Sequence, residues 1–297
     1  MIAEWNTNCV FLAAMLESRH PKLFQGLRQS LVDHGVEVRL LQNVRDVWAV
    51  DYCPVQVAEG TLVKFTYSPD YLRGHEHLIT GDGVVGSFRD VGRCHRSNIV
   101  LDGGNVVTSG RTAFVTDKIY KENPGWERPQ LRDKLQELLQ VDQLLVIPRE
   151  PFDPIGHADG QVRFLDEQTV LVNDYSTVDP AFGERLIRIL RRYRLQVETL
   201  PYFHETRSRE GIPSAVGNFV NFLRTEKVLV APVYGTAQDE IALGKLESLF
   251  PSLPIVYLNC TDLAREGGVL RCISAAYHIS PKKSAALTNS CHRPSPQ

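Results

Sequence analysis

The chain has 297 residues, of which 43% are hydrophobic and 23% are charged, and its formal net charge is -2. This charge gives no reason to expect nucleic acid or an anionic membrane as a partner, and no apolar run approaches the roughly 20 residues that span a bilayer. The six cysteines contain no Cys-x-x-Cys pair, so neither a structural zinc site nor a dense disulfide framework is expected. The N-terminus does not resemble a signal peptide, and we expect a cytoplasmic protein with free thiols.

The first part of the chain predicts a strand, an amphipathic helix and a second strand. Residues 7–16 form an apolar run that is typical of a buried strand. The helix is predicted from Pro21 to His34, with leucines at a spacing of four, Pro21 in its first turn and Gly35 after its end. Residues 36–41 predict the next strand, and residues 46–57 a turn that leads into a third.

A hairpin followed by a helix and a further strand then recurs along the chain, roughly every 50 to 60 residues. The predicted hairpins have their strands at 55–57 and 62–67, 98–107 and 112–116, 161–165 and 169–172, and 218–223 and 228–231. The predicted helices are 128–139, 180–193 and 236–250, and the strands that follow them are 144–147, 196–200 and 254–258. A fifth unit could begin at Gly267, because residues 269–279 are strand-like.

This self-similarity favours a closed α/β ring of ββαβ units, since no single unit buries its own apolar face. An ordinary open α/β sheet is the alternative architecture. We expect residues 1–280 to form one domain. Residues 281–297 are rich in Lys, Ser, Pro and Asn, a composition that is typical of a disordered tail.

Polar residues stand at equivalent places in the repeats, just before or within the first strand, where a core would require apolar side chains. They are Asp51, Asp102, His157 with Asp159, Asn218 or Asn221, and Cys272. In a pseudo-symmetric ring such positions converge near the axis, and a converging polar set indicates a binding or catalytic pocket. The alternative is structural: Asp51 and Asp102 could cap turns, and Cys272 could be an ordinary buried cysteine.

The segment Ile155–Phe164 contains a His and an Asp two residues apart, between two glycines. If it is a strand, His157 and Asp159 point to the same face. An imidazole beside a carboxylate can bind a cation and transfer a proton in one place, although a solvated loop would carry the same residues. Cys272 follows a glycine pair, and its thiolate would be a strong nucleophile if a nearby cation lowered its pKa.

Four segments together resemble those of the guanidino-group-modifying enzymes, closest to the agmatine deiminase and bacterial peptidyl-arginine deiminase branch. They are Trp48-Ala-Val-Asp51-Tyr-Cys-Pro54, Leu101-Asp-Gly-Gly-Asn105, Gly156-His-Ala-Asp-Gly160, and Gly267-Gly268 through Cys272-Ile-Ser274. The resemblance runs from about Asp46 to Ser274 and implies the pentein fold, a five-bladed α/β propeller.

The resemblance also implies roles for these residues. Cys272 would attack a guanidinium carbon, and His157 would protonate the departing ammonia and then activate water. Asp51 and Asp159 would hold the guanidinium nitrogens, with Trp48 and Asn221 at the substrate. Asp102 would orient His157 or bind the cation. No metal or organic cofactor is implied, and the protein could be a monomer or a homo-oligomer.

Two positions depart from the family pattern. Val50 stands where the family has Arg before the first Asp, and Arg271 stands before the nucleophile, where the agmatine branch usually has His.

Arg73, or the cluster Arg89, Arg93 and Arg96, could bind a substrate carboxylate.

The expected partner is a small cationic guanidino compound, with hydrolysis of agmatine to N-carbamoylputrescine and ammonia, a step of putrescine biosynthesis, as the first hypothesis. The alternatives are an arginine or peptidyl-arginine deiminase, an amidinotransferase, and a non-catalytic binding protein on the same fold.

Overall fold

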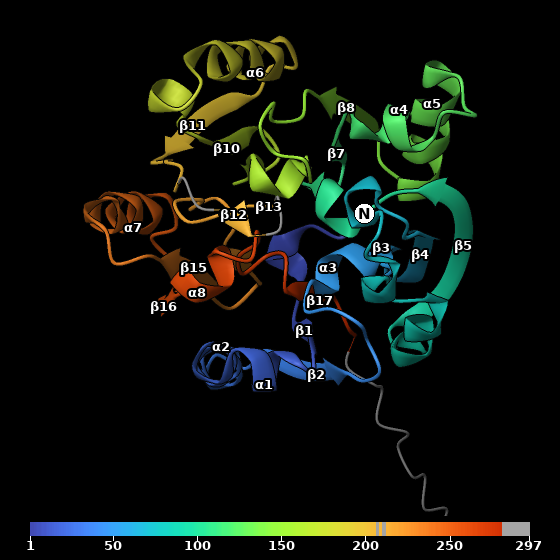
Figure 1. Ribbon diagram of the computed structural model, residues 1–297, viewed down its shortest axis with the longest axis horizontal. Coiled ribbons are helices and arrows are strands. Elements are labelled where there is room, and N and C mark those ends of the chain that lie inside the picture. Colours follow the sequence, from blue (N-terminus) through green and yellow to red (C-terminus); the bar gives the residue numbers. More distant parts are fainter. Residues whose placement is uncertain (206–207, 210–211, 281–297) are drawn as a thin grey trace, which may run out of the picture.

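Five small sheets form a ring with helices on its outside (Figure 1). The structure is a computed structural model and describes residues 1–205, 208–209 and 212–280. In each sheet the first strand is antiparallel to the middle strand, and the middle strand is parallel to the third. The predicted five-bladed α/β propeller is therefore confirmed, and the open sheet is not formed.

The strands of the five blades follow in the order first, middle, third. They are β17 (Ser274–Tyr277), β1 (Cys9–Ala13) and β2 (Glu37–Leu41); β3 (Val55–Ala58), β4 (Gly60–Thr66) and β5 (Gly92–Val100); β6 (Val107–Thr108), β7 (Thr112–Thr116) and β8 (Gln143–Ile147); β9 (Val162–Phe164), β10 (Thr169–Asn173) and β11 (Gln196–Leu200); and β14 (Leu223–Arg224), β15 (Leu229–Val233) and β16 (Ile255–Asn259). A separate two-stranded ladder joins β12 (Ser208–Arg209) to β13 (Ile212–Pro213).

Helices connect the middle strand to the third strand in four of the blades, because two parallel strands require a long crossover between them. The crossover helices are α2 (Pro21–Asp33), α5 (Arg128–Leu139), α6 (Pro180–Arg192) and α7 (Ala237–Leu249). The blade of β3 to β5 instead uses the short 3-10 helices η2 (Asp70–Leu72), η3 (Glu76–Leu78) and η4 (Asp82–Phe88). The remaining short helices are α1 (Leu16–Arg19), α3 (Ala49–Tyr52), α4 (Lys118–Glu122) and α8 (Thr261–Ala264), and the 3-10 helices η1 (Glu4–Asn6), η5 (Gly103–Asn105), η6 (Ala158–Gly160) and η7 (Tyr175–Thr177).

Strands from opposite ends of the sequence close the ring. β17 pairs with β1 in antiparallel register, with Cys9 opposite Tyr277 and Leu12 opposite Ser274. The strand-like stretch after Gly267 is thus the first strand of the blade that β1, α2 and β2 complete. This pairing brings Cys272, two residues before β17, into the centre of the molecule.

The helix signals read from the sequence explain the crossovers. Leu23, Leu27 and Leu31 form the buried stripe of α2. Asp179 caps α6 by accepting from the backbone N–H of Phe182 at 3.0 Å, and Thr236 begins α7 with a capping box. Each cap replaces hydrogen bonds that the first turn of a helix otherwise lacks.

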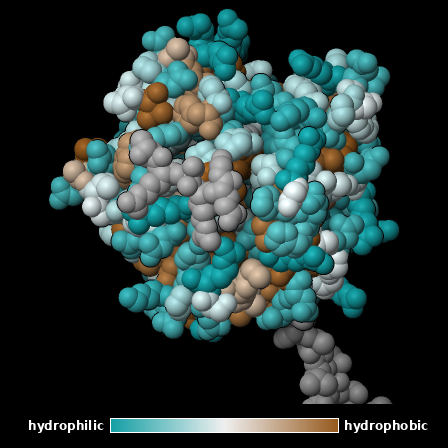
Figure 2. Space-filling view, viewed as in Figure 1, coloured by the Kyte–Doolittle hydropathy of each residue, from teal (hydrophilic) through white to brown (hydrophobic). Residues whose placement is uncertain are grey.

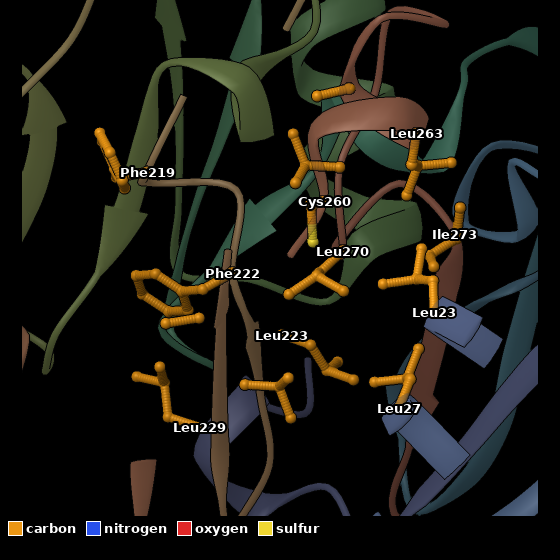
Figure 3. Packing of buried hydrophobic residues seen from close by; sticks show 14 of the residues in the cluster. Leu23, Leu27, Phe219, Phe222, Leu223, Leu229, Cys260, Leu263, Leu270 and Ile273 are labelled. Carbon is orange, nitrogen blue, oxygen red and sulfur yellow. The ribbon is translucent and has the colours of Figure 1, made fainter. Parts of the chain in front are cut away.

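The buried face of α2 packs against the turn that carries Cys272. Leu23 and Leu27 share one hydrophobic cluster with Leu270 and Ile273, the residues around that turn (Figure 3). Both Leu270 and Ile273 are completely buried. Truncating a buried leucine of this kind costs about 2–5 kcal/mol of stability, so this core holds the turn in place.

Three predicted strands were wrong at the places where polar residues gather. Residues 98–107 are not one strand, because β5 ends at Val100 and the turn η5 follows. Residues 218–223 are mostly a turn before the two-residue strand β14, and β17 begins only at Ser274. Asn105 and Asn221 bond to backbone groups of neighbouring turns, and such bonds compete with a strand ladder.

The face shown in Figure 2 is mostly hydrophilic, with small hydrophobic areas between hydrophilic residues. Within the described ranges, no helix has the length and apolar character that crossing a membrane requires. The predicted tail, residues 281–297, lies outside the described residues.

Candidate active site

A cavity of about 120 Å³ lies where the connections between successive blades meet. Trp48, Asp51, His157, Asp159, Asn221 and Cys272 are among the residues that line it. The connection before η5, which carries Asp102, lies behind His157 rather than at the cavity wall. The structure thus brings together the polar residues that the repeat pattern singled out.

Gly104 marks the point on which three of these side chains converge. A Cβ atom placed on Gly104 would lie 2.6 Å from Oδ1 of Asp51, 2.7 Å from Nδ1 of His157 and 3.2 Å from Oδ2 of Asp159. Real Cβ atoms do not tolerate such contacts with fixed polar groups. Glycine is therefore required here for the two carboxylates and the imidazole to approach one another.

Asp51 lies in the short helix α3 and is held by backbone groups. Its Oδ1 accepts a hydrogen bond from the backbone N–H of Gly104 at 3.0 Å, and the preceding N–H of Val50 donates to the carbonyl of Cys272 at 3.2 Å. Asp51 is thus positioned without an arginine at position 50. Burial, followed by the neighbouring Asp102 and Asp159, raises the pKa of Asp51 to about 7, although the charge of His157 acts in the opposite direction.

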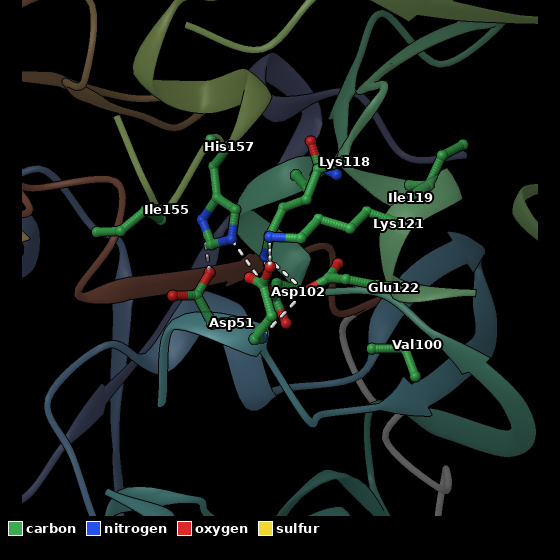
Figure 4. Close-up of polar contacts among 12 residues, drawn as sticks. Asp51, Val100, Asp102, Lys118, Ile119, Lys121, Glu122, Ile155 and His157 are labelled. Carbon is green, nitrogen blue, oxygen red and sulfur yellow. Dashed lines mark hydrogen bonds and ion pairs between the residues drawn. The ribbon is translucent and has the colours of Figure 1, made fainter. Parts of the chain in front are cut away.

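His157 lies between two carboxylates and is nearly completely buried. Its Nε2 lies 2.8 Å from Oδ2 of Asp102, and its Nδ1 lies 3.5 Å from Oδ1 of Asp51 (Figure 4). Burial alone lowers the pKa of an imidazole, but Asp51 and Asp102 more than reverse this effect and raise the pKa of His157 to about 9. The contact with Asp102 would hold the ring in this orientation.

His157 and Asp159 reach the cavity through a turn, so the conditional strand interpretation of Ile155–Phe164 was wrong. His157 precedes the 3-10 helix η6, which contains Asp159, and β9 begins only at Val162. Oδ2 of Asp159 is buried and has no hydrogen-bond partner among the described residues. Burial raises the pKa of Asp159. An unpartnered buried carboxylate oxygen at a cavity wall is suited to bind a cationic group.

Asn221 links the remaining two members of the site. Its Nδ2 donates to the carbonyl of Asp159 at 3.1 Å, and its Oδ1 accepts from the backbone N–H of Arg271 at 3.1 Å. The thiol of Cys272 donates to the same Oδ1 at 3.4 Å. Burial, then the charges of Asp159 and Asp51, raises the pKa of Cys272 well above its ordinary value, so the thiol is protonated while the cavity contains no cation.

The two candidate amides and the tryptophan also reach the cavity. Asn218 lines it but donates its Nδ2 to the carbonyl of Gly160 at 2.9 Å. The indole of Trp48 lies directly against Gly268, where an added Cβ would be 2.5 Å from the ring. This contact explains the second glycine of the Gly267-Gly268 pair.

The arginines suggested by the sequence lie elsewhere. Arg73 is exposed on the C-terminal side of η2, and Arg89, Arg93 and Arg96 are also exposed; none of them lines the cavity. The side chain of Arg271 points away from the cavity and donates from Nε to Glu4 at 3.0 Å. Among the described residues that line the cavity, none is a lysine or an arginine.

Several groups around the site stand in no motif. Glu150 and Asp153 line the cavity, and Tyr202 donates its hydroxyl to Glu150 at 2.6 Å. Lys118, from α4, forms an ion pair with Asp102 behind His157. Gly104 stands in one of the four resembling segments, but the resemblance implies no role for it.

Comparisons with known proteins agree with this geometry. Residues 9–277 match the Porphyromonas-type peptidyl-arginine deiminase family. A Streptococcus mutans protein named "Putative agmatine deiminase" is 24% identical over 208 residues, which cover 60% of this chain and 56% of that protein. The chain therefore spans little more than half the length of the curated relatives that it matches.

Two solved structures show the same fold at low sequence identity. A substrate-bound agmatine deiminase of C. jejuni superimposes with a TM-score of 0.76 at 16% identity, over 93% of this chain and 95% of that one. DDAH of Pseudomonas aeruginosa, in complex with citrulline, superimposes with a TM-score of 0.59 at 10% identity, over 91% and 99% of the two chains. The chain belongs to the Porphyromonas-type peptidyl-arginine deiminase family, within the guanidino-group-modifying superfamily.

Proposed function

We propose that the protein hydrolyses a guanidino compound with an amine at its far end, agmatine being the first candidate, through a covalent intermediate on Cys272. The observation that carries this proposal is the convergence of one thiol, one imidazole and two carboxylates on a single small cavity. The match to named agmatine deiminases supports it.

The two carboxylates suit a planar cation. A guanidinium group presents N–H donors in a fixed plane and pairs with carboxylates in fork geometry. Asp51 and Asp159 each place an oxygen within 3.2 Å of the same point above Gly104. Oδ2 of Asp159 lacks a partner among the described residues, and a guanidinium N–H would supply it.

Binding of the cation would also activate the thiol. Burial, and after it the charges of Asp159 and Asp51, raise the pKa of Cys272. A guanidinium held between these carboxylates neutralises them and places a positive charge beside the sulfur, so the pKa of the thiol falls. The nucleophile therefore forms when the substrate is in place.

The reaction would then proceed in two balanced steps. Sγ of Cys272 forms a bond to the guanidinium carbon, the bond to one terminal nitrogen breaks, and the proton on His157 leaves with it as ammonia. This step forms a thiouronium ester. Neutral His157 then takes one proton from water, the hydroxide adds to the carbon, and the C–S bond breaks. The proton left on the new hydroxyl group passes to the departing sulfur, so the ureido product and the thiol of Cys272 are released.

Carboxylates on the cavity wall favour an amine on the substrate over a carboxylate. Asp153 accepts from the backbone N–H groups of Ile155 and Gly156 at 2.8 and 2.9 Å, and these donors carry no charge that would offset its own. Glu150 accepts from Tyr202 and lies 3.4 Å from Nε2 of His204, and burial raises the pKa of Glu150. The primary amine of agmatine is a cation that the charge of Asp153 attracts.

A specific feature supports peptidyl-arginine or arginine as the second candidate substrate. A surface depression lined by Lys121 and Arg149 shares Tyr71, Phe152 and Asp153 with the cavity. Lys121 is paired with Asp70 at 2.5 Å, whereas Arg149 lies half-buried against Gly156. A carboxylate-bearing substrate that extends from the cavity would reach this arginine.

A substrate panel tests the proposal. Ammonia and ureido-product release are measured with agmatine, arginine, and peptides with internal or C-terminal arginine, each with and without an added primary amine. We expect agmatine to give the highest kcat/KM and ammonia as a product. Exclusive formation of an amidinated amine would indicate an amidinotransferase, and turnover of none of the compounds would favour a non-catalytic binding protein.

A further inference from the structure

Lys118 is completely enclosed, which is unusual for a lysine. Its side chain has 0% exposure, and its Nζ lies 2.6 Å from Oδ2 of Asp102 and 2.8 Å from Oε1 of Glu122. The ammonium also lies 4.9 Å from the centre of the Tyr71 ring. Lysines are almost never fully buried unless they are paired, and removing one partner of a buried pair is strongly destabilising. A buried lysine at this place therefore calls for a reason beyond packing.

The position of Lys118 supplies that reason. Oδ2 of Asp102 receives Nζ of Lys118 at 2.6 Å and Nε2 of His157 at 2.8 Å (Figure 4). One carboxylate oxygen is thus shared between the ammonium and the imidazole. Lys118 does not line the cavity, so it does not touch a substrate there, and the hydrogen bond to Asp102 connects it to His157.

The charges that face His157 come from every element packed around it. Asp51 in α3, Asp102 before η5 and Asp159 in η6 are carboxylates, and the thiol of Cys272, before β17, lines the same cavity. Lys118 is the cation in this set, and Glu122 of α4 partly offsets it. The neutral ring of Tyr71 lies 5.9 Å from the imidazole. Without Lys118, the net charge around the imidazole would be more negative, and the imidazole would hold its proton more strongly.

The proposed reaction requires His157 both to release a proton to ammonia and to accept one from water. We propose that Lys118 is a positioning residue for this reaction, a buried counter-charge that fixes Asp102 against His157 and keeps the imidazole able to exchange its proton. This inference rests on the proposed function.

Electrostatics support the same assignment. Burial and the charge of Lys118 lower the pKa of His157, whereas Asp51 and Asp102 raise it. Burial on its own would raise the pKa of Asp102, but Lys118 and His157 lower it to about 2. Asp102 is therefore ionised at neutral pH, and the ammonium of Lys118 partly offsets its negative charge.

The test is an NMR titration of the His157 side chain in the folded protein without substrate, in wild type and in four variants. The resonance is assigned by its loss in His157→Gln. Lys118→Met removes the counter-charge, and we expect the pKa of His157 to rise by about one unit or more. Glu122→Gln removes the acidic partner of Lys118, so we expect the pKa to fall. Lys118→Arg retains the charge and should leave the pKa near that of wild type.

The double variant Lys118→Met/Glu122→Gln guards against failure of Lys118→Met to fold, because it removes one buried charge of each sign. Its His157 pKa should still rise, since Lys118 bonds directly to Asp102 and lowers the pKa of His157. The pH dependence of kcat should contain a pKa that belongs to His157. In each variant this pKa should move in the same direction as the pKa measured by NMR, with little change in KM.

An unchanged His157 pKa in the folded double variant, with kcat lowered equally at all pH values, would assign Lys118 a merely structural role and overturn the inference. The titration needs no turnover. Absence of activity on every guanidine, together with the expected titration shifts, would therefore refute the proposed reaction while leaving the counter-charge assignment intact.

Discussion

Sγ of Cys272 lies 3.4 Å from Oδ1 of Asn221. The other end of the same amide donates to the carbonyl of Asp159 at 3.1 Å. A single side chain therefore sets the distance between the nucleophile and one of the carboxylates expected to hold the substrate. These groups come from widely separated segments of the sequence, so their common position depends on closure of the propeller.

Replacing Asn221 by aspartate tests this link without changing the size of the side chain. A carboxylate beside the thiol raises the pKa of Cys272, because it disfavours the thiolate. We expect kcat/KM to fall about 10- to 100-fold, equivalent to about 1.4–2.8 kcal/mol. The rise of kcat/KM with pH that follows ionisation of the thiol should move to higher pH. Asn221→Ala should lower the rate without this displacement of the pH profile. Equal pH profiles for the two variants would contradict the assigned contact.

Gly104→Ala should abolish most of the activity while leaving the fold intact. The added methyl group would lie 2.6 Å from Asp51 and 2.7 Å from His157, so both side chains must move apart. Misplacement by about 1 Å can cost about 100-fold in rate. The measurement is kcat with far-UV circular dichroism, and the matched control is Gly86→Ala, where an added Cβ has no atom within 4 Å. Full activity of Gly104→Ala would show that the close approach of Asp51 and His157 at Gly104 is not needed for the reaction.

Affinity for a guanidinium ligand should fall as the pH is lowered below about 7. Burial and neighbouring carboxylates raise the pKa of Asp51 to about 7, and a protonated carboxyl no longer attracts the cation. We expect Kd to increase by up to about tenfold per pH unit below that value. Calorimetry with the inactive Cys272→Ala variant measures this, and Asp51→Asn should remove the pH dependence along with much of the affinity. A Kd that stays constant from pH 5 to pH 8 in the Cys272→Ala protein would be inconsistent with this role.

Two adjacent residues, Glu150 and Arg149, should have opposite effects on substrate choice. Glu150→Gln removes an acidic group from the cavity wall, and we expect about a tenfold loss of kcat/KM for agmatine with a smaller loss for arginine. Arg149→Ala should impair arginine or its peptides and leave agmatine nearly unaffected. The ratio of the two kcat/KM values measures the selectivity. If both variants kept the wild-type ratio of kcat/KM for agmatine to kcat/KM for arginine, neither residue would contribute to recognition of the far end of the substrate.

The sequence predicted most helices closely because their signals are local. Helix α5 and strand β11 have the predicted bounds, α2 and α6 each end one residue before the predicted end, and α7 is one residue shorter at both ends. Apolar periodicity, an N-terminal proline and capping residues all act within a few positions of one another. Closure of the ring was visible only as a repeat, since the pairing of β1 with β17 joins residues that are far apart in the sequence.

The residues of the candidate site could also be predicted only in part. Asp51, His157, Asp159 and Cys272 could be named because motif and repeat position coincide, whereas repeat position indicated Asn218 or Asn221 without a motif. The structure gathers all of them in one cavity. Lys118 and Glu150 had no motif, since each is defined only by what surrounds it in space. Arg73 was chosen for its charge, and an exposed arginine is the ordinary outcome for that residue type.

The central claim is that Cys272 forms a covalent bond with the guanidinium carbon. The most direct test is mass spectrometry of wild-type protein quenched with acid during turnover of agmatine, with peptide mapping of any adduct and ammonia release from Cys272→Ala in parallel. We expect a mass increase confined to the peptide that contains Cys272, and a loss of at least about 10³-fold in the rate of the variant. Ammonia release at an undiminished rate from Cys272→Ala, or an adduct on another residue, would contradict the account.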